Sequence, residues 1–169
     1  TGQYKIIGLP SDEFPPIPSV DGNPFTIDGE ELRSMIQKTE FAASTDETRY
    51  YLNGLFFNLT PDATQIVATD GRRLSVATHD SLEPKPDEPI SVIVPLKAVR
   101  EVVKTFAESP TIQISLKENQ ILFADDNATL VSRLVDGEYP KYEKIIPDNN
   151  DIQVVVEREK LIGPIRRVA

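Results

Sequence analysis

The same order of elements, a helix followed by strands, occurs twice between residues 28 and 135, and this repeat constrains the fold most. Apolar residues at helical spacing predict the first helix over residues 29–39, with Asp28 as the N-cap and a capping-box acid three residues later. The second helix is predicted over 95–107, beginning at Pro95. Its apolar stripe comprises Leu96, Val99, Val103 and Phe106. Two such units packed side by side predict one α+β domain with both helices on one face of its sheets.

Strand patterns fill the segments that follow each helix. Strands are expected over 49–59, 65–69, 73–78, 90–94, 111–116, 121–124 and 129–134. Asp70-Gly71 lies between two of them and predicts a two-residue hairpin, because a type I′ turn needs positive φ at both positions. Four prolines between residues 4 and 19 predict the end of a strand followed by an extended connector.

The connector recurs, which bears on domain organisation. Ser11-Asp12-Glu13-Phe14-Pro15 resembles Asp136-Gly137-Glu138-Tyr139-Pro140, about one domain length further on. A helix is expected from Arg158 to the chain end, with a late start or a kink at Gly163-Pro164. We therefore expect a longer tandem array: residues 1–22 end one domain, 23–150 form a complete one, and 151–169 begin a third. Coincidence is the alternative, since the connector motif is short.

Composition argues against several function classes. The chain has no Cys, so it holds no disulfide, thiolate nucleophile or zinc-thiolate site. No apolar run approaches the roughly 20 residues of a membrane-spanning helix, and no secretory signal is visible. The single histidine, His79, lies in a polar turn without a nucleophile motif, which favours a solvated side chain. We expect no catalytic residue, no metal site and no cofactor.

The distribution of charge is more informative than its sum. The net charge of −9 argues against nucleic acid, because affinity for phosphate comes largely from Lys and Arg. The acids, however, gather in loops, while Lys97, Arg100 and Lys104 follow one face of the second helix. Arg33 and Lys38 project from the first helix away from its apolar stripe. The alternative is that these charges only solubilise exposed helix faces.

Three ordered motifs carry a family resemblance. They are residues 41–54 (FAASTDETRYYLNG), 67–74 (VATDGRRL) and 132–142 (SRLVDGEYPKY). In these motifs, and along nearly its whole length, the chain resembles the bacterial sliding clamps, the beta subunits of DNA polymerase III. The resemblance implies a DNA-clamp fold, with two helix-plus-antiparallel-strand repeats per domain and the helices on one face of curved sheets. It also implies a homodimeric ring in the bacterial cytoplasm that is not an enzyme.

The resemblance implies a processivity factor that encircles double-stranded DNA without reading its sequence. The implied protein partners are the catalytic subunit of DNA polymerase III, the clamp loader, other polymerases and repair proteins. The DNA-facing set expected on this basis is Arg33, Lys38, Asp46, Arg49, Tyr50, Lys97, Arg100 and Lys104. Asp46 is acidic where a neutral polar residue can occur in the family.

The resemblance also implies a pocket between the second and third domains for short partner peptides with Gln and large apolar residues. Carried over position by position, the pocket set is Arg49, Tyr51, Leu52, Thr69, Gly71, Arg72, Arg73, Leu74, Pro140, Lys144 and Ile145. Its leucines, proline and isoleucine offer apolar walls for anchor residues. Arg72 departs from the smaller or aromatic side chain common at its position, which predicts a different peptide preference.

A different function class is kept as the alternative. The chain would then be a standalone β-rich binding module from a tandem-repeat surface protein. On that hypothesis the glycosylation sequons Asn58-Leu59-Thr60 and Asn127-Ala128-Thr129 would be meaningful rather than ordinary strand and turn residues.

Overall fold

The computed structural model describes residues 2–5, 7–10, 13, 24–80, 82–147 and 150–168. These fall into two units, Thr1–Tyr139 and Pro140–Ala169. The second unit contains the 3-10 helix η4 (Tyr142–Lys144) and helix α3 (Arg158–Val168). The elements of the first unit are β1 (Phe25–Asp28), α1 (Gly29–Thr39), the 3-10 helices η2 (Glu40–Ala42) and η3 (Glu47–Leu52), β2 (Gly54–Leu59), β3 (Ala63–Thr69), β4 (Leu74–Asp80), β5 (Ile90–Pro95), α2 (Leu96–Thr105), β6 (Thr111–Lys117), β7 (Gln120–Ala124) and β8 (Thr129–Arg133).

In the first unit, the strand before each helix joins the sheet of the other repeat. One antiparallel sheet has the strand order β1-β6-β7-β8 and the other has the order β4-β3-β2-β5. The strand before α1 pairs with β6, with Ile27 opposite Ile112. The strand before α2 pairs with β2, with Val94 opposite Leu55. Neither repeat completes a four-stranded sheet alone, so the two repeats are interlocked.

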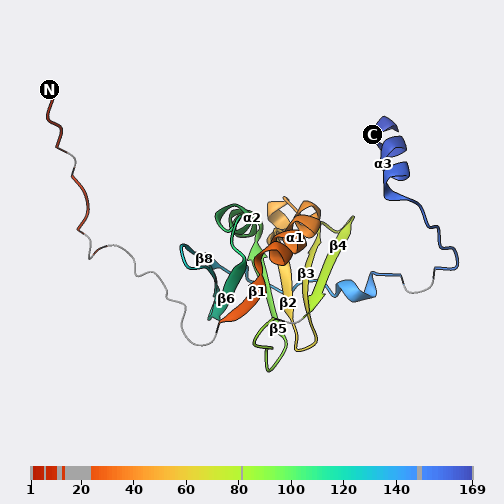
Figure 1. Cartoon of the computed structure of the whole chain (residues 1–169), viewed down its shortest axis with the longest axis horizontal. Coiled ribbons are helices and arrows are strands. Elements are labelled where there is room, and N and C mark those ends of the chain that lie inside the picture. The colour runs from red at the N-terminus through yellow and green to blue at the C-terminus, as the bar shows by residue number, and fades with distance from the viewer. Residues whose placement is uncertain are drawn as a thin grey trace. The chain divides into compact units, whose positions relative to one another are not determined.

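Helices α1 and α2 contact each other and lie on the same side of the strands (Figure 1). Their apolar stripes are buried in one core that both sheets share. Phe57 of β2 and Phe123 of β7 meet edge to face within this core, with ring centroids 6.3 Å apart. The helix residues in it include Leu32, Met35, Ile36, Val99 and Val102. The α+β architecture that the sequence predicted is confirmed, and the polar faces of both helices remain exposed.

The predicted limits of the first two helices are close to those observed. Helix α1 spans 29–39 as predicted, and the Asp28 carboxylate accepts a hydrogen bond from the Glu31 amide at 3.0 Å. Pro95 is both the last residue of β5 and the N-cap of α2, so the helix begins one residue later than predicted. Helix α2 ends at Thr105, and Phe106 is its C-cap.

Three predictions between the helices are wrong. His79, expected in a polar turn, lies in strand β4 opposite Thr64, because β4 continues to Asp80. The first half of the strand predicted over 49–59 is the 3-10 helix η3, because the Asp46 side chain caps a turn there and outweighs the aromatic preference for strands. The β3–β4 hairpin is confirmed, but its loop is 70–73 rather than two residues, since Thr69 pairs with Leu74. Within that loop positive φ occurs at Gly71 but not at a second residue, so the turn is not type I′.

Predictions for the two ends have mixed outcomes. Residues 2–5 and 7–10 belong to no strand, contrary to the predicted strand end, and Pro15, Pro16 and Pro18 lie outside the described residues. Helix α3 begins at Arg158 and includes Pro164, so it does not start late. None of the helices in the described ranges is long and apolar enough to cross a membrane.

The start of α1 packs tightly against the loop after α2. A Cβ added to Gly29 would overlap the backbone carbonyl oxygen of Ser109. We therefore expect Gly29→Ala to lower the free energy of unfolding by about 2–3 kcal/mol, because overpacking outweighs the better helix propensity of alanine. Urea denaturation followed by circular dichroism measures this. Gly163→Ala is the control, since its Cβ would meet only the Arg167 side chain at 4.0 Å. Equal stability of Gly29→Ala and the parent chain would contradict the packing.

Candidate functional site

Lys97, Arg100 and Lys104 form a cationic stripe on the exposed face of α2. The three side chains differ in their surroundings. Arg100 Nε donates to Glu40 Oε2 at 2.9 Å, which links α2 to the residue that follows α1. Lys104 Nζ lies 3.3 Å from Glu101 Oε2, one turn earlier on the same helix. Lys97 is exposed and makes no ion pair within the described part of the chain. The stripe therefore combines one unpaired cation with two that face carboxylates.

The two cations of α1 have separate roles. Lys38 is exposed in the last turn. The half-buried Arg33 donates from Nη1 to the carbonyl oxygens of Phe106, at 2.7 Å, and Ser109, at 3.0 Å. Carbonyls at a helix C-terminus lack partners within the helix, so this guanidinium satisfies the end of α2 and fastens α1 to it. Arg33 thus serves packing between the helices.

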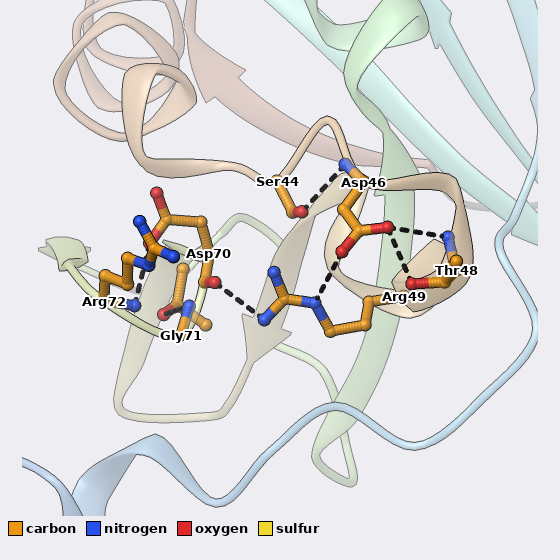
Figure 2. A network of polar contacts seen from close by, with 8 residues as sticks. Ser44, Asp46, Thr48, Arg49, Asp70, Gly71 and Arg72 are labelled. Carbon is orange, nitrogen blue, oxygen red and sulfur yellow. Dashed lines mark hydrogen bonds and ion pairs between the residues drawn. The ribbon is translucent and has the colours of Figure 1, made fainter.

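Arg49 connects η3 to the β3–β4 loop. Its Nε donates to Asp46 Oδ2 at 3.2 Å, and its Nη1 donates to the carbonyl oxygen of Asp70 at 3.0 Å (Figure 2). The Asp46 carboxylate also accepts the amide of Thr48 at 3.0 Å and its hydroxyl at 2.7 Å. Arg49 is half-buried in this network, whereas the next residue, Tyr50, is exposed.

The β3–β4 loop is held in place by its own side chains. Asp70 Oδ1 accepts the amides of Arg72, at 2.9 Å, and Arg73, at 3.0 Å, and Asp70 Oδ2 lies 3.1 Å from Arg73 Nε. Thr69 Oγ1 accepts the Gly71 amide at 3.0 Å and donates to the Arg73 carbonyl at 2.7 Å. Gly71 has φ +85°, and a Cβ there would lie 3.0 Å from a nitrogen of the Arg49 guanidinium. Glycine therefore permits both this backbone conformation and the close approach of the guanidinium.

A cleft of about 300 Å³ lies among η2, η3, the 70–73 loop and the start of α2. One exposed aromatic ring, Phe41, lines it, and the Arg73 guanidinium lies 5.6 Å from the centroid of that ring. The charged residues of the lining are Glu40, Asp46, Arg49, Asp70, Arg72, Arg73 and Arg100. The lining thus holds four guanidinium groups and three carboxylates, and each carboxylate is paired with one of the arginines.

Hydrogen bonds lower the pKa of three aspartates below the ordinary range. The Thr48 hydroxyl and amide, and then Arg49, lower the pKa of Asp46. The amides of Arg72 and Arg73, and then the Arg73 side chain, lower the pKa of Asp70. The Ser109 hydroxyl and two loop amides lower the pKa of Asp125. A lowered pKa favours the ionised form of each carboxyl group. The described residues contain no group of three or more His, Asp or Glu side chains arranged to hold a metal ion.

The structure brings together part of the predicted pocket set. Arg49, Thr69, Gly71 and Arg73 meet around the loop through the contacts above. Leu52 is buried, and Tyr51 and Leu74 are half-buried. The other three members belong to the second unit: Pro140 is half-buried, and Lys144 and Ile145 are exposed.

Sequence reasoning missed three residues of this region. Asp70 organises the loop, and an Asp at the start of a turn signals such side-chain capping. Phe41 stands in a quoted motif, but nothing in the sequence marks it as exposed. Glu40 pairs with a residue sixty positions away, and no local pattern predicts that contact.

Known proteins resemble the chain in sequence and fold. Residues 26–141 match the family model described as DNA polymerase III beta subunit, central domain. The beta sliding clamp of Chlamydia muridarum is 32% identical over 168 residues, covering 98% of this chain and 45% of the relative. A crystal structure of the Pseudomonas aeruginosa DNA polymerase III subunit beta is 33% identical, with a TM-score of 0.85 over 94% of this chain and 44% of that one. The Bacillus subtilis sliding clamp is 30% identical, with a TM-score of 0.87 over 94% and 42%. The chain spans less than half the length of each.

The hydrogen bonds to Asp70 make the loop sensitive to acid. A folded-state pKa below the unfolded value of 3.8 contributes stability at higher pH, and this is lost as the pH falls below 3.8. We expect Asp70→Asn to lower the free energy of unfolding at pH 7 and to reduce its decline between pH 5 and pH 3, as measured by urea denaturation. Asp62→Asn, in the exposed turn at the other end of β3, is the control. An unchanged pH dependence in Asp70→Asn would contradict the role of this carboxylate.

Proposed function

The chain belongs to the DNA polymerase III beta subunit family, and we propose that it forms part of a sliding clamp that encircles duplex DNA as a processivity factor. The match to the central-domain model carries this proposal, and the TM-score of 0.87 with the Bacillus subtilis clamp supports it. Sliding clamps are not enzymes: a tether raises the effective concentration of a polymerase at its substrate. The family assignment gives no support to the alternative of a standalone surface module.

We assign residues 23–150 to the central clamp domain, with 1–22 ending a preceding domain and 151–169 beginning the next. The family match over 26–141 falls within the proposed central domain. The two interlocked repeats form its body, and the recurrence of the connector supports a tandem arrangement. In the same scheme the complete protein is a homodimeric ring in the bacterial cytoplasm.

The proposed DNA face consists of the exposed cations of the helices and the neighbouring η3 turn. Lys97, Arg100 and Lys104 stand on the side of α2 opposite its buried stripe. Lysine and arginine attract backbone phosphates regardless of base sequence, which suits a protein that slides. Lys38, Arg49 and Tyr50 complete the face. Arg33 is left out because it binds backbone carbonyls, and Asp46 contributes by orienting Arg49.

Reversing the charge at Lys97, Arg100 and Lys104 should weaken binding to a labelled DNA duplex at least about tenfold at low salt. The slope of log K against log salt should become shallower by up to about 0.9 for each phosphate that the variant no longer neutralises. Fluorescence anisotropy over a salt series measures both. Reversal of Lys85, Lys117 and Arg133, which are exposed on a loop and at strand ends, is the matched control. An unaltered slope in the α2 variant would remove that helix from the DNA face.

We further propose that the pocket set binds short peptides of replication proteins: the polymerase III catalytic subunit, the clamp loader, other polymerases and repair proteins. The hydrogen bonds within the 70–73 loop favour this, since a preformed wall lowers the entropic cost of binding. Half-buried Leu74, the first residue of β4 after the loop, offers apolar surface, and exposed Arg72 and Arg73 offer donors. Leu52, expected as an apolar wall, is buried and offers almost no surface. The family resemblance also assigns Pro140, Lys144 and Ile145 to this peptide-binding set.

Leu74→Asp should weaken the binding of a peptide that carries Gln and large apolar residues at least about tenfold, because a carboxylate replaces an apolar side chain in the pocket wall. Isothermal titration calorimetry measures the affinity. Thr78→Asp, at an exposed position of the same strand, adds the same charge outside the site and should leave the affinity unchanged. Equal affinities of Leu74→Asp and the parent chain would exclude Leu74 from the pocket.

A further inference from the structure

Glu40 joins the two helical repeats through an ion pair. Its Oε2 accepts a hydrogen bond from Arg100 Nε at 2.9 Å, between residues sixty positions apart. The Glu40 side chain is 29% exposed and that of Arg100 is 56% exposed, so the pair lies at the surface of the helical face. Both residues also line the cleft beside the 70–73 loop.

The position of Glu40 is unfavourable for α1 taken alone. Glu40 is the C-cap of α1, at the negative end of the helix dipole, where an acidic side chain destabilises the helix. A residue that breaks a local rule often serves another contact. Here the carboxylate is turned to Arg100 on the neighbouring helix.

The pair engages the central cation of the α2 stripe. Arg100 lies between Lys97 and Lys104, and a guanidinium offers the same donors to a carboxylate and to a phosphate. A phosphate that approaches α2 must therefore compete with Glu40 for the Nε edge of Arg100. Lys97, without an ion pair among the described residues, faces no such competitor.

We propose that Glu40 limits the binding of DNA phosphates to Arg100 by holding Arg100 in an intramolecular ion pair. A backbone phosphate then contacts the Nε edge of Arg100 only by displacing the Glu40 carboxylate. This inference rests on the DNA-facing role proposed for α2. It makes the Arg100 contact weak and exchangeable, as a ring that moves along DNA without a fixed register requires. Glu40 is thus a positioning residue that acts through Arg100.

The test uses Glu40→Gln in the 169-residue chain, with a labelled DNA duplex and fluorescence anisotropy over a salt series. Freeing Arg100 should tighten binding about two- to fivefold at low salt, the range expected when a surface ion pair is removed. The slope of log K against log salt should become steeper by about 0.9, the value for one additional neutralised phosphate. Thermal melting checks that the variant folds.

Two controls separate an effect of Glu40 through Arg100 from simple repulsion between its carboxylate and the DNA phosphates. Glu30→Gln removes the same charge from the exposed first turn of α1, roughly 15 Å along the helix from Glu40. It should change the affinity less than Glu40→Gln does. In an Arg100→Ala background, Glu40→Gln should have no effect. An equal gain in DNA affinity from Glu30→Gln would contradict the proposal. So would a gain from Glu40→Gln that persists in the Arg100→Ala background.

The outcomes also separate this inference from the proposed function. If charge reversal on α2 weakens DNA binding while Glu40→Gln leaves the affinity and the salt slope unchanged, the role proposed for Glu40 is wrong and the DNA face stands. If charge reversal on α2 has no effect, the DNA-facing role of α2 is wrong, and the inference fails with it.

Discussion

The exchange of strands between the two repeats is the constraint on which the rest of the first unit depends. Because β1 pairs with β6 and β5 pairs with β2, each sheet needs both repeats. The strand before each helix fixes where that helix starts, so the exchange also sets the two helices next to each other. Their stripes then fill a core shared by both sheets, and Arg33 closes the contact at the end of α2. Burial of apolar area stabilises this arrangement, while the strand pairing selects it.

The candidate site lies where the two repeats differ. After α2 the chain reaches β6 through residues 106–110, whereas after α1 it passes through η2 and η3 before β2. This longer connection holds Asp46, Arg49 and Tyr50. Arg49 reaches across to the 70–73 loop, so a segment with little regular structure becomes fixed by side-chain hydrogen bonds. The two similar repeats form the scaffold, and the longer connection between α1 and β2 provides the candidate site.

Charge in this protein is organised by local pairing. The chain has a net charge of −9, yet both guanidinium groups and carboxylates line the cleft. Several acids have defined tasks: Asp46 caps η3, Asp70 holds the loop, and Glu40 faces Arg100. An acidic exterior is compatible with contact to DNA, because attraction depends on the charges within about a Debye length of the phosphates rather than on the whole-chain sum.

Features that depend on neighbours along the chain could be predicted from the amino-acid sequence alone. The apolar spacing and the Asp28 cap located α1, Pro95 located the start of α2, the strands after α2 were found, and ordered motifs gave the family. The 49–53 segment and the 70–73 loop were mispredicted because side-chain caps by Asp46 and Asp70 compete with strand and turn propensities. The tertiary structure decided the rest: the strand exchange, Arg33 at the end of α2, and Glu40 on Arg100. These contacts join residues dozens of positions apart, and their geometry exists only once the two repeats have interlocked.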